Sequence, residues 1–103
     1  MRIVLIEDEP AIRQELTLLL QNAFYDVTAL HDFANAASAA LAASPDLILL
    51  DVKLPGASGF DICTEVRAVS DVPILFLTSQ TSAADELNGM LKGGDDYITK
   101  PFH

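Results

Sequence analysis

Residues 47–56 read LILLDVKLPG, and this stretch decides the fold. Residues 47–50 are apolar without polar alternation, a pattern typical of a strand that is covered on both faces in a parallel sheet. Asp51 follows the run directly and bounds it. The stretch therefore predicts a central parallel strand that carries a carboxylate at its carboxyl end.

Similar apolar runs lie on both sides of this stretch, at residues 3–6, 27–30, 74–77 and, more weakly, 97–99. Segments with a helical period separate the runs. Alternation of strands and helices through a whole chain is typical of an α/β fold, in which parallel strands are joined by right-handed crossovers. We therefore expect an α/β fold with one doubly wound, five-stranded parallel sheet.

The first predicted helix begins at Pro10, which suits a first helical turn. Spacings of three and four place its apolar residues on one stripe, namely Ile12, Leu16, Leu19, Leu20 and Ala23. A second, Ala-rich helix is expected to be capped by Asp32 and to end at Ser44.

The third predicted helix extends from Gly59 to about Val69 with its apolar stripe inward. The fourth begins with a capping-box pattern at Ser82 and ends before Gly93. No linker or repeat interrupts the alternation, so residues 1–103 are expected to form a single domain.

Composition narrows the class of protein further. Fifteen acidic side chains against six basic ones give a formal net charge of -9, which argues against unaided binding to nucleic acid or an anionic membrane and favours a cation. One cysteine cannot form an internal disulfide, and no apolar run reaches the roughly 20 residues of a membrane span. We expect a soluble cytoplasmic protein.

Residues suited to catalysis follow the predicted strands. Glu7 and Asp8 follow the first strand, Asp51 the third, Thr78 the fourth and Lys100 the fifth. Because parallel strands end along one edge of a sheet, these residues are expected to meet there. Clustered carboxylates repel one another unless a cation neutralises them, and Mg²⁺ prefers such oxygen ligands together with phosphate oxygens. A carboxylate can also accept a phosphoryl group, whose oxygens a lysine and a hydroxyl would bind.

Each of these residues also has an ordinary structural interpretation. Asp8 alone could cap the first helix, and Asp51 could be a loop acid. Thr78 could be a strand-end residue, Lys100 a solvated lysine, and Tyr97 a half-buried aromatic.

Three further residues are interpreted as structural. Cys63 is expected to be a small buried hydrophobic side chain, since no histidine lies in its helix. His31 and His103 lack metal-ligand spacing and are expected at the surface.

The chain resembles the receiver domain of bacterial two-component response regulators. The resemblance rests on four stretches in family order and spacing: IVLIEDEP at residues 3–10, LLDVKLPGASGFD at 49–61, PILFLT at 73–78 and GDDYITKPF at 94–102. Jointly these stretches are highly specific, although no single one is. Small departures are Ser79 and Gly94, which stand where the family usually has alanine.

The resemblance implies a site. Asp51 takes the place of the phosphoacceptor aspartate, and Mg²⁺ is the implied cofactor. Its ligands would be Asp8 and Asp51 directly, Glu7 through water, and the backbone carbonyl of Lys53.

The resemblance also implies a switch. Thr78 would follow the phosphoryl group, Tyr97 would fill the space that Thr78 leaves, and Lys100, before a cis Pro101, would bind the phosphoryl oxygens. A histidine kinase would be the donor, and the domain would catalyse only its own phosphorylation and dephosphorylation. The face around the fourth helix and fifth strand would then control an output domain, commonly one that binds DNA.

The sequence departs from the family at its end, because the family continues into a fifth helix after Lys100. The family's strand order, 2-1-3-4-5, leaves only the first helix on one face of the sheet. Inward side chains of the central strands are then expected to face water. We expect a domain truncated before the fifth helix, or a homodimer in which a second copy covers this face.

Three other interpretations remain open. An aspartate-nucleophile phosphatase of the haloacid dehalogenase type would need a second acid at position 53, which is lysine here. A flavodoxin-like or dinucleotide-binding module would need a glycine-rich turn after the first strand, where Glu7 and Asp8 stand. A degenerate receiver would serve only protein contacts, although this sequence keeps the pocket residues.

Overall fold

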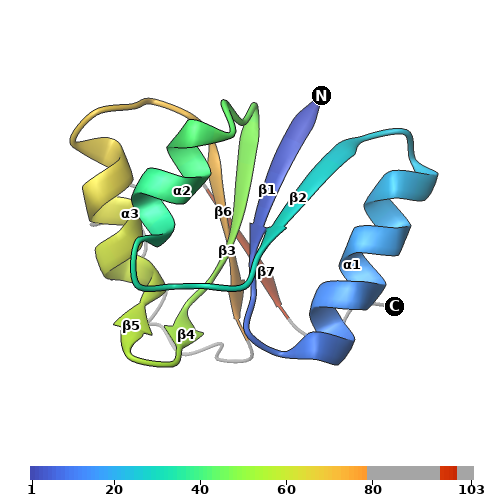
Figure 1. Ribbon diagram of the computed structural model, residues 1–103, viewed down its shortest axis with the longest axis horizontal. Coiled ribbons are helices and arrows are strands. Elements are labelled where there is room, and N and C mark those ends of the chain that lie inside the picture. Colours follow the sequence, from blue (N-terminus) through green and yellow to red (C-terminus); the bar gives the residue numbers. More distant parts are fainter. Residues whose placement is uncertain (79–95, 100–103) are drawn as a thin grey trace.

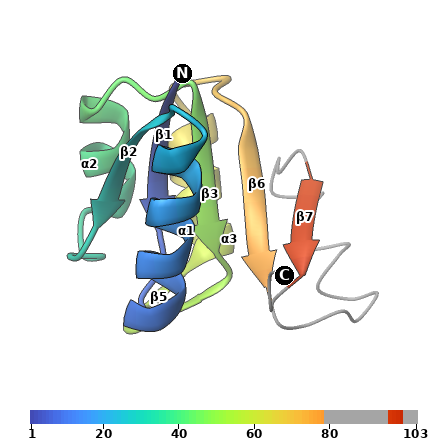
Figure 2. The same cartoon turned by 90° about the vertical axis from the view of Figure 1, so that its right-hand side faces the viewer.

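The computed structural model describes residues 1–78 and 96–99. Within these residues the main sheet has five parallel strands in the order β2-β1-β3-β6-β7 (Figure 2). The strands are β1 Arg2–Ile6, β2 Asp26–Leu30, β3 Leu47–Asp51, β6 Ile74–Thr78 and β7 Asp96–Thr99. Since β6 and β7 are the fourth and fifth strands of this sheet along the chain, the predicted doubly wound α/β sheet of order 2-1-3-4-5 is confirmed.

Helices cover both faces of the sheet (Figure 1). Helix α1 spans Pro10–Asn22 and lies on one face, whereas α2 (Ala36–Ala42) and α3 (Gly59–Arg67) lie on the other. The predicted fourth helix falls outside the described residues. In the part of the chain that the structure describes, no helix is long and apolar enough to cross a membrane.

The central strands β1 and β3 are apolar on both sides because each side packs against a helix layer. Ile3 and Leu5 belong to the cluster on the α1 side, and Val4 and Ile6 to the cluster beneath α2 and α3. A fully buried Leu or Ile side chain stabilises the fold by roughly 1.5–3 kcal/mol. The two clusters together fix the central strands and therefore the positions at which those strands end.

Helix α1 buries a narrower stripe than its sequence predicts. Leu16 is buried and Ile12 and Leu20 are half-buried, but Leu19 is 61% exposed and Ala23 is exposed as well. Among the described residues only the sheet packs against α1. Ile12, Leu16 and Leu20, which are spaced by four, fill that contact. The prediction is wrong for Leu19 and Ala23.

Two further boundaries differ from expectation. Helix α2 begins at Ala36 with Asn35 as its N-cap, and the Oδ1 of Asp32 accepts a hydrogen bond from the Ala34 N–H at 3.0 Å. Asp32 therefore closes the preceding turn, because a short acid bonds the backbone two residues on as readily as it caps a helix. Helix α3 ends at Arg67, which leaves Val69 74% exposed.

A small antiparallel hairpin, which the sequence analysis did not predict, joins β3 to α3. Strand β4 (Lys53–Leu54) pairs with β5 (Ala57–Ser58). Gly56 in the turn has a φ of 68°, a conformation that glycine adopts without steric cost. The hairpin brings the chain back to the end of β3.

The face that α1 covers is better protected than expected. Ile3, Leu5, Leu49 and Leu77 are at most 4% exposed, because Leu16 of α1 packs into the same cluster. The prediction that inward side chains of this face contact water is wrong for these four. Leu47 and Leu75 are half-buried.

Candidate metal centre

Three acidic side chains converge at the carboxyl edge of the sheet. One carboxylate oxygen each from Glu7, Asp8 and Asp51 lies within 4.8 Å of the others. Strands β1 and β3 are neighbours with Ile6 opposite Leu50, so the residues that follow Ile6 lie beside Asp51. The structure thus brings together these three acids from two distant parts of the chain, as the sequence predicts.

The three acids are more buried than surface acids usually are. Glu7 is 0% exposed and Asp51 5%, and Asp8 is half-buried. Clustered, buried carboxylates are unfavourable unless a positive charge neutralises them. Three hard oxygen donors within reach of one another fit Mg²⁺, which one or two carboxylates and several waters typically hold in proteins.

The β1–α1 connection presents the first two acids. The Oε2 of Glu7 accepts a hydrogen bond from the Glu9 N–H at 3.2 Å, and the Nη1 of Arg13 donates to the Glu7 carbonyl oxygen at 3.1 Å. The N-cap of α1 is Glu9 and not Asp8, and the Glu9 side chain makes no capping hydrogen bond. The ordinary interpretation of Asp8 as a helix cap is therefore wrong, which leaves its carboxylate to the acidic cluster.

The β3–α3 connection fixes the third acid. The Val52 N–H, next to Asp51, donates to the Leu77 carbonyl at 3.1 Å, and the Gly59 N–H donates to the Val52 carbonyl at 2.8 Å. The Ser58 hydroxyl caps α3 by accepting from the Phe60 N–H at 3.2 Å. Helix α3 thus begins directly against the end of β3.

The other predicted site residues are placed less completely. Lys53 opens the hairpin with an exposed side chain, two positions after Asp51. Thr78 ends β6, one position beyond Leu77, which lies opposite Asp51. The backbone of Tyr97 in β7 pairs with Phe76. The side chains of Thr78 and Tyr97, and the whole of Lys100, lie outside the described part.

The residues interpreted as structural agree with that interpretation where they are described. Cys63 is buried in the α3 layer at 0% exposure, and His31 is exposed. His103 lies outside the described residues.

Sequence reasoning missed two residues that contact the backbone of the acidic site, Arg13 and Gly59. The glycine had one usable signal, because it follows a turn at Pro55 and Gly56 and precedes a helix. Arg13 had none, since an arginine in a helix normally indicates a solvent-facing position.

The fold and the acids define a class: an open α/β domain of flavodoxin-like topology, with a carboxylate cluster at the edge where such sheets bind ligands. The chain belongs to the response regulator receiver domain family, whose sequence pattern matches residues 3–103. The resemblance seen in the sequence is confirmed.

Individual relatives agree with this assignment. The chain is 41% identical over 101 residues to the DNA-binding response regulator MtrA of Mycolicibacterium smegmatis. The aligned region covers 98% of this chain and 44% of MtrA. The BeF₃-activated N-terminal receiver domain of RstA from Klebsiella pneumoniae superposes with a TM-score of 0.93 at 31% identity, covering 100% of this chain and 88% of that one. Response regulator TrrA of Thermotoga maritima, in complex with Mg²⁺-BeF, has a TM-score of 0.87 at 30% identity, covering 99% of this chain and 88% of that one. The chain thus spans less than half the length of MtrA.

Proposed function

We propose that this domain is a phosphorylation-activated signalling switch in which Asp51 accepts a phosphoryl group from a histidine kinase. The observation that carries the proposal is the acidic cluster. Asp51 is buried in it, and one of its carboxylate oxygens lies within 4.8 Å of a carboxylate oxygen of Glu7 and of Asp8. A carboxylate in such a position is held at one place and can act as a nucleophile. The similar RstA receiver domain, which is BeF₃-activated, supports the proposal.

The cluster would hold Mg²⁺. Asp8 and Asp51 would be direct ligands, Glu7 would bind through water, and the backbone carbonyl of Lys53 would complete the protein's ligands. When bound, the cation would supply positive charge against the phosphoryl oxygens as negative charge develops on them. The complex of TrrA with Mg²⁺-BeF supports this assignment.

The transfer itself is a substitution at phosphorus. A carboxylate oxygen of Asp51 attacks the phosphorus and forms a new P–O bond. The bond from phosphorus to the histidine nitrogen breaks, and the imidazole takes the electron pair and a proton. Hydrolysis of the resulting acyl phosphate releases inorganic phosphate and regenerates the carboxylate.

The response would depend on residues at the same edge of the sheet. In the proposal, Lys100 binds a phosphoryl oxygen, Thr78 moves toward the group, and Tyr97 fills the space that Thr78 leaves. The position of Thr78 at the end of β6, beside β3, supports its part in this sequence.

At the level of the whole protein, we propose a DNA-binding output domain, because the matched region is less than half of the DNA-binding regulator MtrA. A second copy of the chain would cover the half-buried Leu47 and Leu75 in a homodimer. A cytoplasmic location would follow, since the kinase domain that phosphorylates a regulator acts there.

The test is incubation with acetyl phosphate and Mg²⁺ followed by intact-mass measurement. We expect one added phosphoryl group that is absent with EDTA and absent in Asp51→Asn. The matched control is Asp61→Asn, which removes an exposed aspartate from the first turn of α3 and should leave the modification intact. Modification that persists in Asp51→Asn would refute the proposal, and repeated turnover of a generic phosphate ester would favour the phosphatase instead.

A further inference from the structure

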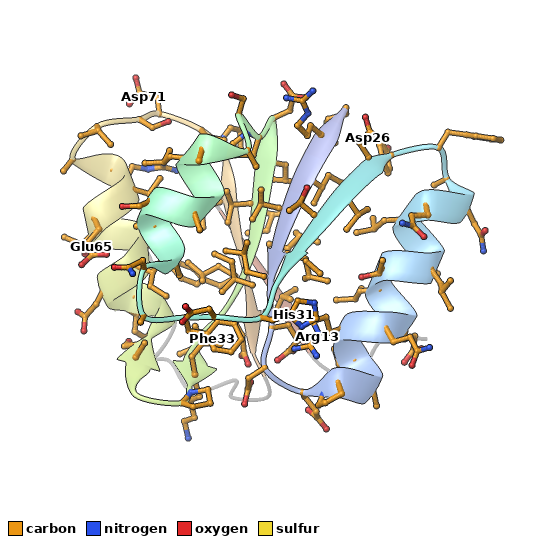
Figure 3. All side chains as sticks on the ribbon, in the orientation of Figure 1. Arg13, Asp26, His31, Phe33, Glu65 and Asp71 are labelled. Carbon is orange, nitrogen blue, oxygen red and sulfur yellow. The ribbon has the colours of Figure 1, made fainter. Side chains whose placement is uncertain are left out.

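Arg13 makes an unusual contact for an arginine in an amphipathic helix. It lies in the second turn of α1, where its own N–H donates to the Glu9 carbonyl at 2.9 Å. Its side chain is half-buried and donates from Nη1 to the Glu7 carbonyl oxygen at 3.1 Å. Figure 3 shows Arg13 on α1 at the end of the sheet where β1 stops. The guanidinium thus reaches back to the connection that carries two of the three acids.

The bonded carbonyl lies one residue beyond the last paired position of the sheet. Strand β1 ends at Ile6, which is the last residue of β1 paired with β2 and with β3. The Glu7 carbonyl belongs to the peptide unit that joins Glu7 to Asp8, and that unit is planar. A donor that holds this carbonyl therefore also fixes the direction in which the chain leaves toward Asp8.

We propose that Arg13 is a positioning residue of the acidic site, which holds the Glu7–Asp8 peptide so that both carboxylates face Asp51. The proposal rests on the proposed function in one respect, namely that the acids bind a divalent cation. Arg13 contacts neither the cation nor the phosphoryl group in this role. It acts through the backbone of a residue that does.

The positive charge of Arg13 provides a way to separate positioning from simple electrostatics. A cation beside three acids repels a second cation, so removing the guanidinium charge alone should strengthen Mg²⁺ binding. Removing the hydrogen bond that orients the acids should weaken it, because supporting residues around metal ligands typically contribute roughly tenfold or more to affinity. The two explanations predict opposite signs.

Arg67 offers a matched control on the other side of the sheet. Its Nη1 also donates to backbone carbonyls, those of Ser70 at 3.3 Å and Val72 at 2.6 Å, and its side chain is likewise half-buried. It ends α3, whose first residue lies against Asp51, and is therefore roughly 12 Å further along the helix axis. Arg67→Gln removes the same charge and the same kind of bond away from the acids.

The experiment is a calorimetric titration of the chain with Mg²⁺ after EDTA treatment and dialysis. We expect Arg13→Ala to bind Mg²⁺ roughly tenfold more weakly than the wild type. Arg13→Lys keeps a donor and should lie between the two, and Arg67→Gln should bind as the wild type does. Amide hydrogen exchange without metal gives a second readout, in which Arg13→Ala should speed exchange at Asp8 and Glu9 and Arg67→Gln should not.

Unchanged or tighter Mg²⁺ binding by Arg13→Ala would overturn the inference, and tighter binding would indicate that the charge of Arg13 acts by electrostatics alone. If Arg13→Ala fails to fold, Arg13→Lys is compared with Arg67→Gln instead. Weaker Mg²⁺ binding by Arg13→Lys, but not by Arg67→Gln, would support the inference. If the wild type itself binds no Mg²⁺, the proposed function fails rather than this inference. The two failures are therefore distinguishable.

Discussion

Gly59, the first residue of α3, lies against the backbone of Asp51, the last residue of β3. A Cβ atom at position 59 would lie 2.9 Å from the carbonyl carbon of Asp51 and still closer to its carbonyl oxygen. Backbone atoms cannot yield as a flexible side chain would. The absence of a side chain at Gly59 therefore sets the spacing between helix and strand at the acidic site.

Replacing this glycine should damage both stability and the site. We expect Gly59→Ala to lower the free energy of unfolding by about 1–3 kcal/mol, the usual cost of forcing extra atoms into a packed region, and to weaken Mg²⁺ binding because Asp51 shifts. Urea unfolding and calorimetry measure the two effects. Gly56→Ala is the control: its Cβ would meet nothing within 4 Å, but its φ of 68° makes alanine strained. It should lose about 1 kcal/mol with unchanged affinity, and equal affinities in both variants would contradict the role of Gly59.

The acidic cluster should make stability depend on the cation. Without divalent ions, Asp8→Asn relieves repulsion among the acids and should raise the free energy of unfolding by on the order of 1 kcal/mol. In Mg²⁺ at about 100 times its dissociation constant, the wild type should gain about 2.7 kcal/mol that the variant largely lacks. Thermal unfolding in EDTA and in Mg²⁺ should therefore reverse the order of the two proteins. The control is Glu15→Gln, which removes one negative charge from an exposed position on α1 and should show no such reversal. If Asp8→Asn also shows no reversal, the three acids do not act as a cation site.

Helix α1 is followed by a residue with a strained backbone conformation, and a substitution can remove this strain. Phe24 has a φ of 69° and is 94% exposed, and the bonds from Phe24 N–H to the Gln21 carbonyl (3.0 Å) and from Tyr25 N–H to the Leu20 carbonyl (3.1 Å) form a Schellman motif. Glycine is the residue that adopts this conformation without cost. We expect Phe24→Gly to raise the free energy of unfolding by about 0.5–1 kcal/mol, after allowance for the greater freedom of glycine in the unfolded chain. Phe24→Ala keeps the strain and should give no such gain in urea unfolding, so an equal gain in both variants would point away from the backbone.

Cys63 should report on opening of the α3 layer. Its side chain is 0% exposed, so a thiol reagent can reach it only when this part of the structure opens. We expect labelling to be slower than that of a model thiol by orders of magnitude, and slower still in Mg²⁺ if the cation stabilises the fold. The rate is followed by absorbance with an aromatic disulfide reagent. Rapid labelling in native buffer would contradict the described packing.

The sequence predicts the large elements of this fold because each carries its own signal. Residues 47–50 and 3–6 form short apolar runs typical of strands covered on both faces, and the acids that follow them mark the carboxyl edge. The hairpin of β4 and β5 could not be predicted in this way, since each strand has two residues and no periodicity. The prediction that Asp32 caps α2 is wrong because the Asp32 carboxylate bonds the Ala34 N–H in the preceding turn, and a short acid suits either position.

The supporting residues of the site depend on distances that no pattern encodes. The contact of Gly59 with Asp51 exists because the hairpin returns the chain to β3, and the bond from Arg13 to Glu7 exists because α1 begins close to the end of β1. Sequence reasoning therefore found the acids, which have a chemical signature, and missed the residues that hold them.

The pairing of β1 with β3 determines when, during synthesis of the chain, the acidic cluster can form. While the ribosome is still making the region before β3, the emerging polypeptide carries Glu7 and Asp8 but lacks their counterpart. A copy in which these strands later separate loses both the sheet and the acidic cluster. Incomplete copies would therefore lack the three-acid cluster.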